Sequence, residues 1–144
     1  KGIHIETTTL LIPKLNDDPK EITELCKWHM AKLGPDTPLH FSRFYPAYKI
    51  SNVPPTPIET VAKAREIAVN EGIRYVYTGN IAGDPGENTY CPSCKQLLIG
   101  RYGYDIGRWQ LTGDNRCQKC MNPIPIVGTY EQRPATFSRL IFSA

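Results

Sequence analysis

The fold class is decided by one stretch, residues 56–78, which reads TPIETVAKAREIAVNEGIRYVYT. Thr56, with Glu59 three residues later, matches the capping box of a helix N-terminus, and Pro57 suits the first helical position. Apolar residues then recur at helical spacing, and the β-branched and aromatic run 73–78 follows at once. The stretch therefore predicts a helix that leads directly into a strand.

The same alternation precedes it. Residues 3–12 form a β-branched run, Asn16 or Asp17 offers a helix N-cap, and Gly34 ends the apolar periodicity before a second strand at 39–44. Strands joined by crossover helices pair in parallel, and their C-terminal ends are open for chemistry. We therefore predict an α/β fold whose three parallel strands make part of a barrel or of an open sheet.

Length and charge restrict the classes of function. The 144 residues have room for one ordinary domain, or for one small domain with a metal-stabilised appendage. The formal net charge of +3 is too small and too scattered to indicate nucleic acid. No stretch approaches the roughly 20 apolar residues that cross a bilayer, and the start resembles no signal peptide. We expect no membrane association and a cytoplasmic protein.

The N-terminus suggests a longer parent. The chain begins with Lys1 rather than Met and passes at once into a predicted strand. This favours a fragment of a larger protein, the alternative being a processed or trimmed N-terminus.

Four cysteines predict a metal site. Cys91 and Cys94 form one C-x-x-C knuckle and Cys117 and Cys120 another, with 22 residues between the knuckles that contain two short predicted strands, 96–102 and 106–111. Four thiolates suit the tetrahedral preference of Zn²⁺. Iron would use the same ligands, and disulfides or free thiols are the remaining alternatives, although a cytosolic chain argues against disulfides. We predict a structural zinc site in a zinc-ribbon-like hairpin.

Three details qualify this site. Lys95 and Met121 stand where such knuckles often carry glycine. A closed four-thiolate shell leaves no position for substrate, so catalysis at the metal is not expected. Cys26 lies apart, on the apolar face of the first predicted helix, where packing is the expected role.

Several separate segments resemble one family in the same order. They are IETTTLLIPKLND (5–17), HFSRFYPAYK (40–49), VPPTP (53–57), YVYTGN (75–80) and GENTYCP (86–92). They resemble the C-terminal part of the radical S-adenosylmethionine enzymes of the AmmeMemoRadiSam system, relatives of the pyruvate formate-lyase activating enzymes. The resemblance covers about residues 2–128.

The resemblance implies a parent oxidoreductase with a partial (β/α)₆ barrel, a TIM-barrel relative, in which a [4Fe-4S] cluster cleaves S-adenosylmethionine to a 5′-deoxyadenosyl radical. Residues 1–80 would be the later barrel strands and 81–128 the zinc-ribbon-like appendage, while 129–144 stay unassigned. The C-x-x-x-C-x-x-C motif that would hold the cluster is missing here. The chain alone is therefore not expected to be active, and the substrate of the radical is unknown.

Four residues are the expected cofactor contacts in such a parent. Thr8, His40, Arg43 and Tyr45 come at or near the C-terminal ends of predicted strands, where ligands bind. Arg43 would clamp a carboxylate or simply be ion-paired, His40 would be a ligand or a core histidine, and Tyr45 would line the opening or pack.

A rival class is a non-enzymatic ribbon that binds protein or nucleic acid through Arg101, Arg108, Trp109 and Arg116. Nucleic acid is the less favoured partner. An exposed sheet edge would also favour pairing with a second copy of the chain.

Overall fold

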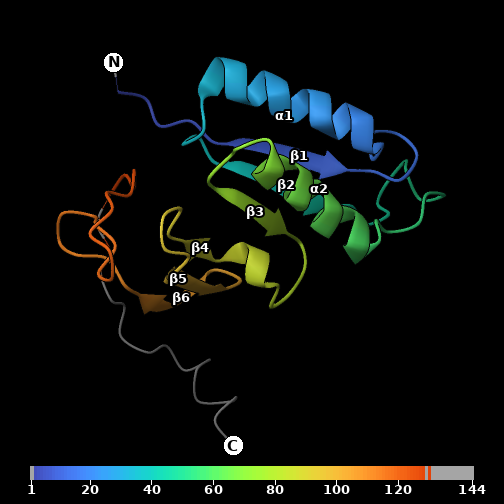
Figure 1. Ribbon diagram of the computed structural model, residues 1–144. Helices are drawn as coiled ribbons and strands as arrows, with labels where there is room; N and C mark the ends of the chain where they lie inside the picture. Colours follow the sequence, from blue (N-terminus) through green and yellow to red (C-terminus); the bar gives the residue numbers. More distant parts are fainter. Residues whose placement is uncertain (1, 129, 131–144) are drawn as a thin grey trace, which may run out of the picture.

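The computed structural model describes residues 2–128 and Tyr130, which form two small three-stranded sheets (Figure 1). The first sheet is parallel, in the order β1 (Thr7–Leu11), β2 (Leu39–Arg43) and β3 (Val76–Gly79). The second is antiparallel, in the order β4 (Thr89–Tyr90), β5 (Leu97–Tyr102) and β6 (Asp105–Trp109). The chain is thus mixed α/β, as predicted, and its described strands close no barrel.

Helices α1 (Pro19–Leu33) and α2 (Ile58–Asn70) are the crossovers of the parallel sheet. Both pack on one face, where Ile22 and Cys26 from α1 meet Val61 and Ala64 from α2 in a single core with Phe41 of β2. In a parallel pair, residues in register point to the same side of the sheet. The second face, which carries the register row Thr8, His40 and Tyr77, is therefore left free of helices.

Helix α1 begins one or two residues later than predicted, since its N-cap follows both Asn16 and Asp17. Its N-cap is Asp18, whose carboxylate accepts a hydrogen bond from the Lys20 backbone at 2.8 Å. Asn16 and Asp17 instead hold the preceding turn by accepting from earlier backbone N–H groups. The reason is Pro19, which fits the first helical position and forces its predecessor into the extended conformation of a cap. The predicted end at Gly34 is confirmed, with φ at 82°.

The capping box predicted at Thr56 is wrong. Helix α2 has Pro57 as N-cap and no side-chain capping bond. The fully buried Thr56 hydroxyl donates instead to the Leu11 carbonyl at 2.6 Å and accepts from the Phe44 N–H at 3.2 Å. Buried backbone groups at the ends of β1 and β2 need partners more than an exposed helix start does, because water can satisfy the latter.

Two predicted strands were too long at their N-terminal ends. Strand β1 starts at Thr7 rather than Ile3, because Thr7 pairs with Leu39, the first residue of β2. Ile3 is 75% exposed. Strand β3 starts at Val76 rather than Ile73, whose N–H instead closes the end of α2 on the Ala68 carbonyl.

The second sheet confirms the two short strands predicted between the knuckles. A 3₁₀ turn, η1 (Pro85–Glu87), leads from β3 into it. Its core contains Leu98, Ile99 and Leu111, and Tyr75, which directly precedes β3, packs into the same cluster. The second sheet therefore packs against the parallel sheet, and the expected boundary near residue 80 is crossed by this contact.

Within residues 2–128, neither helix combines the length and the apolar character needed to span a bilayer.

Candidate metal centre and adjoining cavity

The four predicted cysteines converge on one point. The sulfurs of Cys91 and Cys120 lie 3.5 Å apart, those of Cys94 and Cys117 lie 3.7 Å apart, and all four lie within 4.8 Å of one another. A tetrahedron with Zn–S bonds of about 2.3 Å has edges of roughly 3.8 Å. The sulfurs are thus spaced for one tetrahedral ion, which fits a mononuclear metal site.

The same spacing does not fit the radical-generating cluster. In a [4Fe-4S] cluster each thiolate binds a different iron, so the sulfurs stand further apart than around a single ion. The four cysteines also form two C-x-x-C pairs rather than the C-x-x-x-C-x-x-C loop. The described residues therefore provide no site for that cluster.

The two knuckles share one backbone design. Lys95 N–H donates to the Cys91 carbonyl at 3.0 Å, and Met121 N–H donates to the Cys117 carbonyl at 2.9 Å. In both knuckles the residue after the second cysteine has a φ of 59°. This is the left-handed region that glycine adopts freely, so the departure from glycine noted in the sequence is accommodated at the expense of local strain.

Two of the thiols have shifted pKa values. Burial opposes ionisation of Cys117, but the backbone N–H groups of Cys120 and Lys119 stabilise the thiolate and lower its pKa to about 7. For Cys94, the backbone hydrogen bond from Gln96 favours the thiolate, yet burial and the neighbouring thiols raise its pKa to about 11. Metal binding requires all four thiolates and therefore releases protons.

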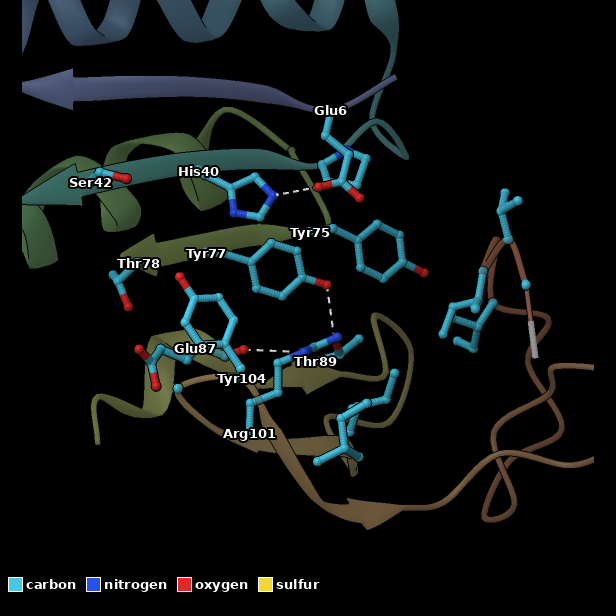
Figure 2. A pocket seen from close by; sticks show the side chains of 18 of the residues that line it. Glu6, His40, Ser42, Tyr75, Tyr77, Thr78, Glu87, Thr89, Arg101 and Tyr104 are labelled. Atoms are coloured by element: carbon cyan, nitrogen blue, oxygen red, sulfur yellow. Dashed lines mark hydrogen bonds and ion pairs between the residues drawn. The ribbon is translucent and has the colours of Figure 1, made fainter. Parts of the chain in front are cut away.

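A large cavity lies between the two sheets (Figure 2). It measures about 1040 Å³ and is lined by the helix-free face of the parallel sheet and by the second sheet. His40 and Tyr77 contribute from the first wall, and Arg101 and Trp109 from the second. The four-cysteine group adjoins this cavity, because Cys91 and Cys117 belong to the same core as Leu98 and Ile99 of β5.

Of the predicted cofactor contacts, Thr8 and His40 are brought side by side. They are register partners on β1 and β2, but each is the second residue of its strand, so the expected position near the C-terminal end is wrong for both. His40 lines the cavity, whereas Thr8 is not among its described lining residues. His40 Nε2 donates to the Glu6 carboxylate at 2.9 Å, and the imidazole stacks on Tyr77 with 5.0 Å between the ring centroids. It is therefore a partly exposed, partnered histidine on the open face rather than a core residue.

Arg43 and Tyr45 form a separate group at the C-terminal ends of the strands. Arg43 Nε donates to the Thr56 carbonyl at 2.7 Å, and its Nη1 donates to the Tyr45 hydroxyl at 2.8 Å. That hydroxyl donates in turn to the Asn80 carbonyl. Arg43 lies two residues after the buried Phe41, so its side chain points to the helix-covered side of the sheet. The group therefore connects loops at the strand ends. Of its described members, Tyr45 and Asn80 line the cavity.

The residues of the rival nucleic-acid hypothesis are largely engaged within the fold. Arg101 Nη1 donates to the Glu87 carbonyl and to the Thr89 hydroxyl, with the guanidinium over the Tyr77 ring. Arg116 binds Asp114 and the Met121 carbonyl, and Trp109 stacks on Tyr130. For Arg108, no ion pair or ring contact is found among residues 2–128 and Tyr130.

Glu6, Tyr75, Tyr77 and Glu87 line the cavity and were not singled out from the sequence. Alternation along β3 could have assigned Tyr75 and Tyr77 to one face. Nothing local indicated that Glu87 would approach the same space, because the turn η1 and the packing of the second sheet bring it there.

Comparison with known proteins gives a relative without an assigned function. An uncharacterized protein of Methanocaldococcus jannaschii is 47% identical to this chain over 127 residues. The match covers 88% of this chain and 38% of that protein, so the chain spans well under half of the length of this relative. No family model matches the chain, and no solved structure matches it.

Proposed function

We propose that the chain is the C-terminal part of a radical S-adenosylmethionine enzyme that resembles the pyruvate formate-lyase activating enzymes. In this proposal residues 1–80 supply late strands of its partial barrel. Residues 81–128 form a structural zinc ribbon that closes one side of its ligand cavity. The length of the M. jannaschii relative leaves room for an N-terminal part that would hold the cluster.

One observation carries this proposal: the two faces of the parallel sheet differ, one being covered by helices and the other facing a cavity. The helices cover one face with an apolar core, whereas the other face presents His40, Ser42 and Tyr77 to a cavity. A segment of barrel wall is built in this way, with helices outside and ligand-facing side chains inside or at the strand ends. An independent small α/β domain would instead bury both faces of a parallel sheet.

The cluster, when bound in the parent, supplies the electron that cleaves S-adenosylmethionine. The residues of this chain would have a different task. His40 and Tyr45 would shape the wall against which cofactor or substrate lies, with Thr8 beside His40 on the neighbouring strand, and Arg43 would hold Tyr45 in position through the 2.8 Å hydrogen bond.

The metal in the ribbon is proposed to be zinc with a structural role. Four thiolates complete the tetrahedron and leave no open position, so the ion stabilises the fold without taking part in chemistry. Elemental analysis of the purified chain should give one equivalent of zinc. One equivalent of iron, with visible absorption, would instead show that the four cysteines hold a rubredoxin-like iron site.

The enzymatic part is tested on the longer gene product. Its sequence upstream of Lys1 should contain a C-x-x-x-C-x-x-C motif. The anaerobically reconstituted protein should form 5′-deoxyadenosine from S-adenosylmethionine and a reductant. Serine variants of that upstream motif should abolish this product while leaving the ribbon zinc in place. The absence of the motif from the upstream sequence would refute the proposal.

A further inference from the structure

The cavity between the sheets contains polar groups that the described residues leave without partners. Only two buried side-chain atoms in the described part lack a hydrogen bond, the Tyr75 hydroxyl and Oε2 of Glu87, and both residues line this cavity. Tyr75 is 6% exposed. Buried polar atoms in folded proteins nearly always have a partner, so Tyr75 and Glu87 are the lining residues whose polar groups a ligand would complement.

The charges of the lining indicate the sign of that ligand. Among the described residues, three carboxylates line the cavity, from Glu6, Asp36 and Glu87, against the guanidinium of Arg101 and that of Arg74, which is paired with Asp36. The chain as a whole carries a formal charge of +3. A locally acidic cavity in a basic chain favours a cation.

Glu87 is the carboxylate best placed to receive it. Glu6 is shared between His4 and His40, and Asp36 is paired with Arg74 at 2.9 Å. Glu87 forms no ion pair with any residue that the structure describes. Its turn is fixed, because the Asp84 carboxylate accepts from Gly86 N–H and from the Thr78 hydroxyl on β3.

The walls suit an organic cation better than a bare metal ion. Aromatic rings line the cavity, among them Trp109 from β6 and Tyr130, which stack on each other, and the faces of such rings attract ammonium groups. Ile99 and Ile106 add apolar surface beside them. Figure 2 shows Glu87 and Tyr75 on opposite sides of the view, with Tyr77 and Arg101 between them.

From these observations we propose that the cavity binds an organic ammonium ion, with the ammonium group on the Glu87 carboxylate and an apolar body against the second sheet. This inference does not rest on radical chemistry, since it requires only the cavity and the metal-loaded fold. It holds or fails independently of the enzymatic proposal.

The test compares three probes of one shape on the zinc-loaded chain. They are 4-phenylbutylammonium, 4-phenylbutanol and 4-phenylbutyrate, which differ only in the polar end. Trp28 is replaced by Phe, because it lies exposed on α1, so that Trp109 in the cavity is the fluorescent reporter. The ammonium probe should bind saturably and at least about tenfold more tightly than the alcohol, with the carboxylate weakest, as expected for a hydrogen bond to a charged group.

Glu87→Gln should remove this preference, and Glu66→Gln is the matched control, since Glu66 lies on α2 and pairs with Lys63. Equal binding of the ammonium and the alcohol to the chain that keeps Glu87 would overturn the proposal. So would the absence of any saturable change, or a preference that survives Glu87→Gln. The probe comparison needs no variant at Glu87 and so stays decisive if that variant does not fold.

Discussion

Met121 and Lys95 occupy a backbone conformation that most residues avoid. Both have a φ of 59°, directly after the second cysteine of a knuckle. The left-handed region costs a residue with a Cβ about 1–2 kcal/mol, and a β-branched side chain tolerates it worst. Both knuckles therefore hold a conformation that the local sequence does not favour.

Replacing Met121 tests this strain. Met121→Gly should keep or slightly raise the free energy of unfolding, because relief of strain offsets the extra freedom of glycine in the unfolded chain. Met121→Val should be less stable than Met121→Gly by about 1–2 kcal/mol. Denaturant unfolding of both zinc-loaded variants gives the comparison. Equal stabilities would show that the knuckle relaxes to a different conformation.

Tyr75 and Tyr77 allow a matched comparison on one face of one strand. The Tyr77 hydroxyl bonds to the Thr89 hydroxyl at 2.9 Å, whereas the buried Tyr75 hydroxyl has no partner among the described residues. Burial raises the pKa of Tyr75 well above its ordinary value, so the phenol stays neutral. An unsatisfied buried hydroxyl costs about 1–3 kcal/mol.

Tyr75→Phe should therefore leave the ligand-free chain as stable as before or more stable, by up to about 1–3 kcal/mol. Tyr77→Phe should lose about 0.5–1.5 kcal/mol with its hydrogen bond. Thermal unfolding of both variants, each with zinc bound, measures the difference. A larger loss for Tyr75→Phe than for Tyr77→Phe would mean that the Tyr75 hydroxyl has a structural partner.

At the scale of elements, the sequence predicted which segments fold and was less accurate about where they begin. The alternation of strands and helices, the end of α1 at Gly34 and the hairpin between the knuckles followed from local patterns. Strand starts depended on where the partner strand begins, as Thr7 and Leu39 show. Thr56 was misassigned because a buried tertiary hydrogen bond outweighed a local cap.

The candidate site divides in the same way. The four cysteines were readable because each pair is close in sequence and the ligand chemistry is specific. The cavity could not be predicted from the sequence, because Glu6, Tyr75 and Glu87 come from separate segments and line one space only when the second sheet packs on the first. Thr8 and His40 lie side by side because β1 and β2 pair in parallel from Thr7 and Leu39 onward.

Thr56 connects three elements and so gives a test at this scale. Its hydroxyl bonds to Leu11 at the end of β1 and to Phe44 after β2, directly before α2. Thr56→Val keeps the shape and removes both bonds, which should lower the free energy of unfolding by about 1–3 kcal/mol. Thr56→Ser keeps the hydroxyl and should lose less. If serine and valine are equally destabilising, packing of the methyl group rather than the hydrogen bonds is the main contribution.

For the whole molecule, the open edges of the parallel sheet invite partners. Strands β1 and β3 each have one unpaired edge within the described residues. Unpaired edge strands template pairing with another chain. We predict that the isolated chain self-associates in sedimentation experiments, and that the proposed parent, with further barrel strands on these edges, would not. A monomeric isolated chain over a wide concentration range would contradict this.

Metal loading should depend on pH in a defined direction. The thiols must lose their protons to bind, and the pKa of Cys94 is raised to about 11 while that of Cys117 is lowered to about 7. Lowering the pH from 8 to 6 should therefore weaken zinc binding, because protons compete for the sulfurs. Chelator competition at several pH values measures this. A zinc affinity that does not change with pH would contradict four-thiolate ligation.

Removal of the metal tests how far the two sheets are independent. The core under α1 and α2 is separate from the core around the cysteines, and only Tyr75 and Tyr77 of the parallel sheet belong to the latter. A ribbon of this size cannot bury enough apolar surface to fold without its metal, so chelation should unfold about residues 88–128 and leave α1 and α2 formed. Cys26 reports on this directly, because it is buried in the helical core, and burial raises its pKa to about 11. After chelation, the four knuckle cysteines should be alkylated quickly and Cys26 slowly, and added zinc should restore protection of the four. If Cys26 reacts as fast as the others, the sheets unfold as one unit and the metal holds the whole chain together.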